Sequence, residues 1–209
     1  MDGNSWDSDS TRNLLERIHD QETAALDELL ARDRDLIRGI IALRYDAEMR
    51  ARLEISDIVQ EAQLQIARRM PDYLQRRPMP YHLWVRRTTL ETMLQLRRHH
   101  FAQRRQPQTG RVLPHHSSLL IVEQLIDPGP GPLQRLLEQE AREQVQQAVS
   151  RLSATDQEVL LLRTVEHLTN DEAAQVLGLN PGTASRRFGR ALLNLRDQVN
   201  RLLPPDATA

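Results

Sequence analysis

The side chains with the clearest chemistry lie near the C-terminus, in the segment 181–202. As a helix, this segment would carry an apolar stripe at helical spacing: Ala184, Phe188, Ala191, Leu192, Leu195, Val199 and Leu202. A turn of about 100° per residue points four polar or basic side chains away from that stripe, mostly near the helix start: Thr183, Arg186, Arg187 and Arg190. Arginine donates paired hydrogen bonds to phosphate or guanine, so this layout favours contact with nucleic acid.

The residues before this segment predict another helix and a tight turn. Thr169 and Glu172 have the spacing of a capping box, and Gly178 suits the left-handed position that ends a helix. Asn180 is a good N-cap, and Pro181 would occupy the first helical position. The two helices predict a helix-turn-helix, whose second helix enters the major groove of DNA. The alternative is an ordinary helical hairpin with a solvated basic face.

A second recognition surface is predicted on a helix that Ser56 would cap and that would end before Pro71. Its inward face is apolar and comprises Ile58, Val59, Ala62, Ile66 and Met70. Its outward face carries Asp57, Gln60, Glu61, Leu64 and Arg68. An outward leucine beside acids and an amide suits a basic partner helix. The alternative is a solvated face whose acids favour the start of the helix.

Aromatic and basic side chains are combined in a predicted helix over residues 81–105, namely Tyr81, Trp84, Arg86, Arg87, Arg97, Arg98, Arg104 and Arg105. Arginines bind phosphates and aromatic rings stack on unpaired bases, so this helix favours contact with melted DNA. The preceding loop, 72–80, carries Arg76 and Arg77 and would suit an extruded base. Alternatively, Trp84 and Phe101 belong to the core, and we expect Trp84 to be at least partly buried.

Charge is distributed unevenly along the 209 residues, although the net charge is only −1. Residues 1–61 contain 15 acids and 8 arginines. Residues 62–122 contain 2 acids and 11 arginines, and residues 123–209 contain 12 acids and 9 arginines. The basic middle segment and the basic C-terminal helix predict two nucleic-acid faces on a nearly neutral chain.

The pattern of apolar residues predicts an all-α fold with two small helical domains. We expect a disordered N-terminus over 1–10, a first helical domain over 11–106, a helix-turn-helix domain over 133–203 and a disordered tail over 204–209. The stretch 107–132 is rich in proline and glycine, which is typical of a flexible linker.

Several classes of function are disfavoured. The chain lacks the common nucleophile, phosphate-loop, dinucleotide and zinc-protease motifs, so we expect no enzyme, catalytic residue or cofactor. The adjacent histidines at 99–100 and 115–116 would point in different directions, so no metal site is expected. There is no cysteine for a disulfide. No apolar run approaches the roughly 20 residues that span a membrane, and the N-terminus is unlike a signal peptide, so we expect a cytoplasmic protein without a membrane partner.

On these motifs, the chain resembles bacterial extracytoplasmic-function sigma factors, the small two-domain initiation factors of RNA polymerase. The resemblance spans about residues 14–199. The family's second-region helix, usually written D-x-V-Q-E, is similar to SDIVQEAQLQIARR. The promoter-binding helices that follow are similar to PYHLWVRRTTLETMLQLRRHH. The family's fourth region is similar to residues 152–197, which include LTNDEAAQVLGLNPGTASRRFGRALLNLRD.

The resemblance implies a role for each surface. Clamp helices of the largest subunit of core RNA polymerase would bind Asp57, Gln60, Glu61 and Leu64. The −10 promoter element would be melted and read by Arg76, Arg77, Trp84, Arg86, Arg87, Arg97 and Arg98. The −35 element would be contacted by Thr183, Ser185, Arg186, Arg187 and Arg190. The linker would thread toward the active-site and RNA-exit channels, and anti-sigma factors are a further class of partner that the resemblance allows.

One stretch departs from the family pattern. Where the family often has RNLALDHLRR, this chain has TLETMLQLRR, which alters the expected −10 preference but not the fold. The segment 78–100 is closer to variants abundant in planctomycete-like genomes. The alternative function is a dimeric helix-turn-helix regulator of duplex DNA, which is disfavoured because the basic aromatic helix lies in the first domain.

Overall fold

The computed structural model describes residues 9–101, 113–125 and 143–202, and within them every regular element is a helix. The all-α prediction is therefore confirmed. The chain divides into two compact units, residues 1–106 and 107–209, which are described in turn.

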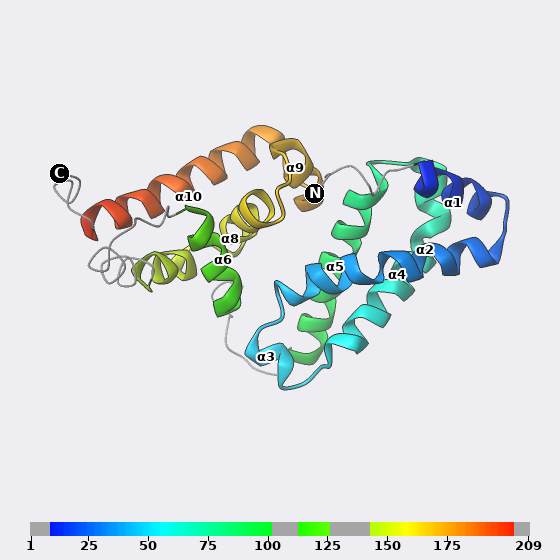
Figure 1. The fold of residues 1–209 in the computed structure, drawn as a ribbon, viewed down its shortest axis with the longest axis horizontal. Coiled ribbons are helices and arrows are strands. Elements are labelled where there is room, and N and C mark those ends of the chain that lie inside the picture. Colours follow the sequence, from blue (N-terminus) through cyan, green and yellow to red (C-terminus); the bar gives the residue numbers. More distant parts are fainter. Residues whose placement is uncertain (1–8, 102–112, 126–142, 203–209) are drawn as a thin grey trace. The chain divides into compact units, whose positions relative to one another are not determined.

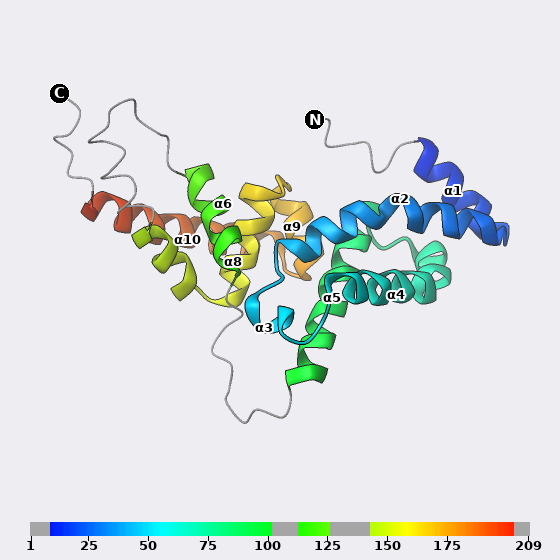
Figure 2. The same ribbon diagram turned by 60° about the horizontal axis from the view of Figure 1, so that its bottom comes forward.

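The first unit is a bundle of helices with one shared core (Figure 1). It contains α1 (Asp9–His19), α2 (Thr23–Ala42), the short α3 (Ala47–Arg50), α4 (Ile55–Arg76) and α5 (Tyr81–Phe101). The long helices α2, α4 and α5 pack against one another in pairs, and α1 packs mainly on α2. Figure 2 shows α2 and α4 lying side by side. This packing fixes one face of α4 toward the core and leaves the opposite face for solvent, whereas α5 is buried on most sides over residues 81–93.

The core of this unit forms where the sequence places its apolar periodicity. The inward residues predicted for α4 are all buried: Ile58, Val59, Ala62, Ile66 and Met70. They pack with Leu29, Ile37 and Ile41 of α2 and with aromatic side chains at the start of α5. Burial of each such aliphatic side chain contributes on the order of 2 kcal/mol.

The ends of α4 differ from the prediction. The helix starts at Ile55, its N-cap Glu54 makes no side-chain capping hydrogen bond, and Ser56 lies inside the first turn. Ile55 packs against the core, which extends the helix at this end. At the other end α4 continues through Pro71 to Arg76. Pro71 has no N–H, so one carbonyl in the preceding turn has no partner in the helix. Because Pro71 is exposed, water can hydrogen-bond to that carbonyl, and the helix is not broken. Only residues 77–80 of the predicted loop are non-helical.

The N-terminal prediction also needs correction. Residues 9–10, expected to be disordered, begin α1, where Asp9 pairs with Arg12 one turn later and Thr11 is buried. Residues 1–8, 102–112, 126–142 and 203–209 lie outside the described residues, and with them parts of the predicted terminus, linker and tail.

The second unit carries the predicted helix-turn-helix. Its elements are α6 (His115–Leu125), a helix over 143–151, α8 (Ala154–Leu160), the π-helical turn η2 (Leu161–Val165), α9 (Asn170–Leu177) and α10 (Pro181–Leu202). Both α8 and α9 pack against α10, and α9 also packs against η2. The buried residues Val159, Leu160, Leu161 and Leu162 run from α8 into η2 and form the centre of this unit.

A helix, α6, lies inside the stretch that the sequence predicted as a linker. Ile121 and Val122 are fully buried, and α6 packs against η2. The backbone N–H of Leu113 donates to the Gln157 side chain of α8 at 2.9 Å. Residues 113–125 therefore belong to the second unit. The prediction was wrong here because it weighed the flanking prolines and glycines above the apolar run between them.

Candidate nucleic-acid and partner interfaces

The helix-turn-helix has the local geometry that its sequence predicts. Thr169 Oγ1 accepts from the Glu172 N–H at 3.3 Å, and Glu172 Oε2 accepts from the Thr169 N–H at 2.7 Å, which completes the capping box. Gly178 has φ 64°, the left-handed conformation at which glycine is favoured. Asn180 Oδ1 then accepts from the Gly182 N–H at 2.9 Å, and α10 begins at Pro181. These contacts fix the turn between α9 and α10.

The apolar stripe of α10 packs inward as predicted. Ala184, Ala191 and Leu195 are buried, and Phe188 and Leu192 are partly buried. The side chains of Val199 and Leu202 lie outside the described residues. With this side occupied by the core, the start of α10 presents its opposite side to solvent.

Three of the five residues predicted for −35 contact are exposed on that side: Ser185, Arg186 and Arg190. Thr183 is half-buried and its Oγ1 accepts from Arg186 at 3.4 Å. Arg187 differs from the outward arginine that was predicted. Its side chain is 30% exposed, against 70% for Arg190, and its Nη1 donates to Asp156 Oδ1 of α8 at 2.8 Å. Burial acts to raise the pKa of Asp156, but hydrogen bonds from Ser153 and Arg187 outweigh this effect and lower it.

The predicted partner face of α4 points outward. Asp57 and Gln60 are exposed, and Leu64 is 43% exposed, which is unusual for a large apolar side chain in this unit. Glu61 is half-buried, and its Oε1 accepts from Gln65 at 2.8 Å. The arrangement is an exposed leucine flanked by two carboxylates, as a basic and partly apolar partner helix would require.

Trp84 belongs to the core of the first unit. It is 8% exposed and stacks on Tyr73, with ring centroids 4.5 Å apart, and Tyr81 lies at 5.9 Å. The expectation that Trp84 is at least partly buried is confirmed. The reason is packing: three aromatic rings from α4 and α5 bury more apolar area together than a single exposed indole would. The side chain of Phe101 lies outside the described residues.

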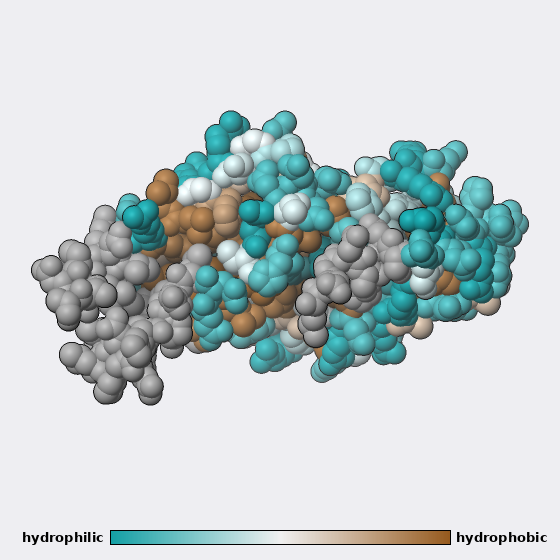
Figure 3. Space-filling model, turned by 45° about the horizontal axis from the view of Figure 1, so that its top comes forward, coloured by the Kyte–Doolittle hydropathy of each residue, from teal (hydrophilic) through white to brown (hydrophobic). Residues whose placement is uncertain are grey.

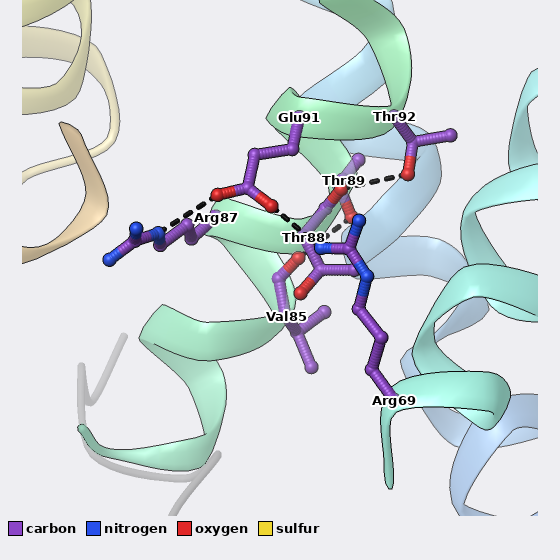
Figure 4. A network of polar contacts seen from close by, with 7 residues as sticks. All are labelled: Arg69, Val85, Arg87, Thr88, Thr89, Glu91 and Thr92. Carbon is purple, nitrogen blue, oxygen red and sulfur yellow. Dashed lines mark hydrogen bonds and ion pairs between the residues drawn. The ribbon is translucent and has the colours of Figure 1, made fainter. Parts of the chain in front are cut away.

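Several arginines of the predicted −10 surface are held by acids. Arg97 is only 14% exposed and forms an ion pair with Asp46, while Glu48 lies 3.9 Å from it. Figure 4 shows Arg69 of α4 and Arg87 of α5 both bonded to Glu91, at 2.6 and 3.0 Å. Desolvation opposes ionisation of Glu91, but the hydrogen bonds from Arg69 and Arg87 lower its pKa.

The remaining basic residues of this surface are more open. Arg77 and Arg98 are exposed, Arg76 is exposed and pairs with Asp72 at 2.9 Å, and Arg86 is half-buried. Arg77 itself has φ 39°, a left-handed conformation that turns the chain from α4 into the loop 77–80. Arg104 and Arg105 lie outside the described residues.

A pocket of about 320 Å³ lies where this loop meets α4 and α5. Its lining combines the loop, the edge of the aromatic cluster and the Glu91 network: Arg69, Asp72, Arg76, Pro78, Met79, Trp84, Arg87, Thr88 and Glu91. The opening therefore brings arginines, carboxylates and the edge of an indole together.

Sequence reasoning missed the acidic partners of these arginines. The pair Arg87–Glu91 has the i, i+4 spacing of a helical ion pair and was detectable. The pairs Arg97–Asp46 and Arg187–Asp156 join residues 51 and 31 positions apart, and no local signal predicts them. The exposed Leu193 of α10, at 62%, was also missed. Figure 3 shows that apolar residues gather on the visible face of the second unit, whereas that of the first is mostly hydrophilic.

No helix among the described residues is both long and apolar enough to cross a membrane. Within the same residues, no three His, Asp or Glu side chains gather in a way that would hold a metal ion.

The chain is similar to known proteins in both sequence and fold. Residues 142–195 match the family model described as sigma-70, region 4. The RNA polymerase sigma-H factor of Pseudomonas aeruginosa is 24% identical over 195 residues, which cover 93% of this chain and 94% of that protein. A probable RNA polymerase sigma factor of Xanthomonas campestris pv. campestris, RfaY, is 27% identical over 143 residues. That match covers 68% of this chain but only 33% of RfaY, so the chain spans about a third of that relative's length.

The fold of the chain is also similar to a solved structure, that of CnrH in complex with the cytosolic domain of CnrY. The TM-score is 0.55 at 20% identity, covering 92% of this chain and 99% of the other. The family model and both relatives are therefore of RNA polymerase sigma factors, and the family model covers the stretch that contains α9 and the start of α10. These matches do not favour the dimeric regulator.

Proposed function

We propose that the protein is an extracytoplasmic-function sigma factor that binds bacterial core RNA polymerase and directs promoter-specific initiation of transcription. In this proposal the first unit contacts the −10 element and the second the −35 element. The observation that carries the proposal is the solvent-facing start of α10, with Arg186 and Arg190 exposed inside the stretch that matches sigma-70 region 4. The planctomycete-like subgroup stays a prediction from the sequence, as do the domain boundaries apart from the corrections at residues 9–10 and 113–125.

For the −35 element, the exposed side chains are the best candidates. Ser185, Arg186 and Arg190 would enter the major groove with the start of α10, and Thr183 would support Arg186 through their 3.4 Å contact. Arginine reads guanine through paired hydrogen bonds to O6 and N7. Arg187 has a weaker claim because Asp156 already binds it.

For the −10 element, the opening between α4 and α5 is the best candidate. Arg76, Arg77 and Arg98 would attract the phosphates of a melted strand, and the pocket lined by Arg87 and Trp84 would take a base. The half-buried Arg86 lies on the same helix. Arg97 would act indirectly, by tying α5 to Asp46 of the α2–α3 connection.

For core RNA polymerase, the outward face of α4 is the candidate surface. Asp57, Gln60, Glu61 and Leu64 would contact clamp helices of the largest subunit, with carboxylates against basic residues and Leu64 in an apolar contact. An anti-sigma factor is a second class of partner for a protein of this group.

The test is co-elution of the purified chain with bacterial core RNA polymerase in size-exclusion chromatography. We expect the wild type to co-elute and Glu61→Arg to elute alone, because the substitution reverses a charge at the centre of the contact face. The control is Asp35→Arg, the same charge change at an exposed residue of α2. Circular dichroism confirms that both variants are folded. Normal co-elution of folded Glu61→Arg would refute the partner face, and failure of the wild type to co-elute would refute the function.

A further inference from the structure

Asp156 lies at the start of α8 but its carboxylate reaches the recognition helix α10. Its Oδ1 is 2.8 Å from Arg187 Nη1 and 3.8 Å from Arg190 Nη2. Its Oδ2 accepts from Ser153 Oγ at 2.7 Å, and Ser153 Oγ accepts from the Asp156 N–H at 3.2 Å. With its side chain only 12% exposed, the carboxylate is held in place by the cap of α8 as well as by the two arginines.

The two arginines are affected differently by this contact. Arg187 is drawn against α8, where its Nε is buried without a hydrogen-bond partner. Arg190 keeps 70% of its side chain exposed and shares the carboxylate only at longer range. Arg186, which directly precedes Arg187 in α10, is exposed. At the start of α10, Arg186 and Arg190 are therefore exposed to solvent, whereas Arg187 is bound to Asp156.

We propose that Asp156 is a specificity-determining residue that keeps Arg187 away from DNA and partly offsets the charge of Arg190. This inference rests on the proposed function, in which α10 contacts promoter DNA. Contacts to phosphates supply affinity that is independent of sequence, whereas contacts to base edges discriminate. A fixed carboxylate beside α10 weakens the attraction to phosphates. It leaves Arg186 and Arg190 able to contact base edges.

A purely structural role for Asp156, joining α8 to α10, makes a different prediction. In that case removal of its charge would loosen α10 and weaken DNA binding. If Asp156 acts through charge, its removal strengthens binding to DNA of any sequence and makes that binding more sensitive to salt. The sign of the change in affinity therefore separates the two roles.

The experiment measures binding of the full chain to a fluorescent duplex of mixed sequence, by anisotropy at several salt concentrations between roughly 50 and 200 mM. We expect Asp156→Asn to bind about fivefold tighter, which is the scale of one exposed ion pair. The slope of log affinity against log salt should steepen by about 0.9 for each additional phosphate that the variant neutralises. The matched control is Asp197→Asn, which removes an exposed charge of α10 itself, roughly 15 Å along the helix from Arg187, and should change affinity less than about twofold.

Arg187→Gln completes a double-mutant cycle and gives a measurement that does not depend on Asp156→Asn folding. We expect Arg187→Gln alone to weaken binding less than Arg186→Gln does, because it leaves the Asp156 carboxylate unpaired but removes no DNA contact. In the double variant it should remove most of the increase in affinity from Asp156→Asn. Equal or weaker binding by folded Asp156→Asn would overturn the inference. So would a loss of affinity in Arg187→Gln as large as that in Arg186→Gln, because Arg187 would then already contact DNA.

Co-elution of the same wild-type preparation with core RNA polymerase separates this test from that of the proposed function. Failure to bind polymerase would count against a sigma factor, whereas the duplex measurements test Asp156 without polymerase. Tighter DNA binding by Asp156→Asn without polymerase binding would therefore support the charge effect and contradict the function on which it rests.

Discussion

At the scale of single residues, the role of each arginine depends on whether an acid is within reach. Arg186 and Arg190 are exposed at the start of α10, whereas Arg187 is bound by Asp156 and Arg97 by Asp46. The sequence correctly predicts that Arg186, Arg187 and Arg190 share one helix and that Arg97 lies on another. It does not reveal which of them the fold has already paired, because the acids lie 31 and 51 positions away along the chain.

One buried acid allows a prediction about pH. Asp33 is fully buried, and its Oδ2 accepts from the Tyr81 hydroxyl at 2.7 Å, which links α2 to the start of α5. Burial raises the pKa of Asp33, while the hydrogen bond from Tyr81 and the charge of Arg32 act in the opposite direction. With a raised folded-state pKa, Asp33 favours the folded state most at low pH, and this contribution is lost as the pH rises through that pKa.

We therefore expect Tyr81→Phe to reduce the free energy of unfolding by about 1–3 kcal/mol at pH 7.5, since it leaves a buried carboxylate without its donor. The loss should shrink as the pH falls, because protonated Asp33 needs the donor less. Urea unfolding at pH 7.5 and pH 5 measures both effects. The control is Tyr73→Phe, which removes a hydroxyl that donates to the neutral Met79 carbonyl at 3.2 Å. A loss in Tyr81→Phe that is the same at both pH values would contradict the account.

At the scale of elements, helix ends are predicted well where side chains or glycine cap them and poorly where packing decides. The capping box of α9, its glycine end and the start of α10 follow directly from Thr169, Glu172, Gly178 and Pro181. The start of α4 and its passage through Pro71 do not, because the buried residues along that helix outweigh one proline on its exposed side. The helix α6 was missed for the same reason.

The turn of the helix-turn-helix allows a paired prediction about stability. Gly178 has a positive φ, so Gly178→Ala should destabilise the second unit by about 1 kcal/mol. Gly189 lies inside α10 with open space around its missing Cβ, so Gly189→Ala should stabilise the same unit by about 0.5–1 kcal/mol. Thermal unfolding of the two variants measures both changes. Stabilisation by Gly178→Ala would contradict the conformation assigned to the turn.

At the scale of the whole molecule, charge is divided between units with different surfaces. The first unit combines an acidic face on α4 with a basic opening beside α5, and the second exposes arginines on α10. The sequence predicts this division from the local excess of arginine, and the fold class from apolar periodicity. The sequence does not predict which arginines are paired with acids. Glu91 binds arginines in the first unit, and Asp156 binds Arg187 in the second.

Two DNA contacts on one chain have a functional consequence in our proposal. Each contact alone can be modest, because binding of one raises the effective concentration of the other at the same promoter. A nearly neutral chain with acids beside its arginines then binds DNA weakly by itself and depends on polymerase for placement. This explains how a net charge of −1 is compatible with a DNA-binding role.

The most direct test of the central claim is transcription by a reconstituted mixture of this chain and bacterial core RNA polymerase, on fragmented DNA from the source genome, with RNA 5′ ends mapped. We predict discrete new 5′ ends that share two upstream sequence blocks. Glu61→Arg should produce none, and Arg186→Ala should weaken dependence on the distal block by about 1–3 kcal/mol. The absence of new 5′ ends with wild-type protein that is folded and bound to polymerase would contradict the account.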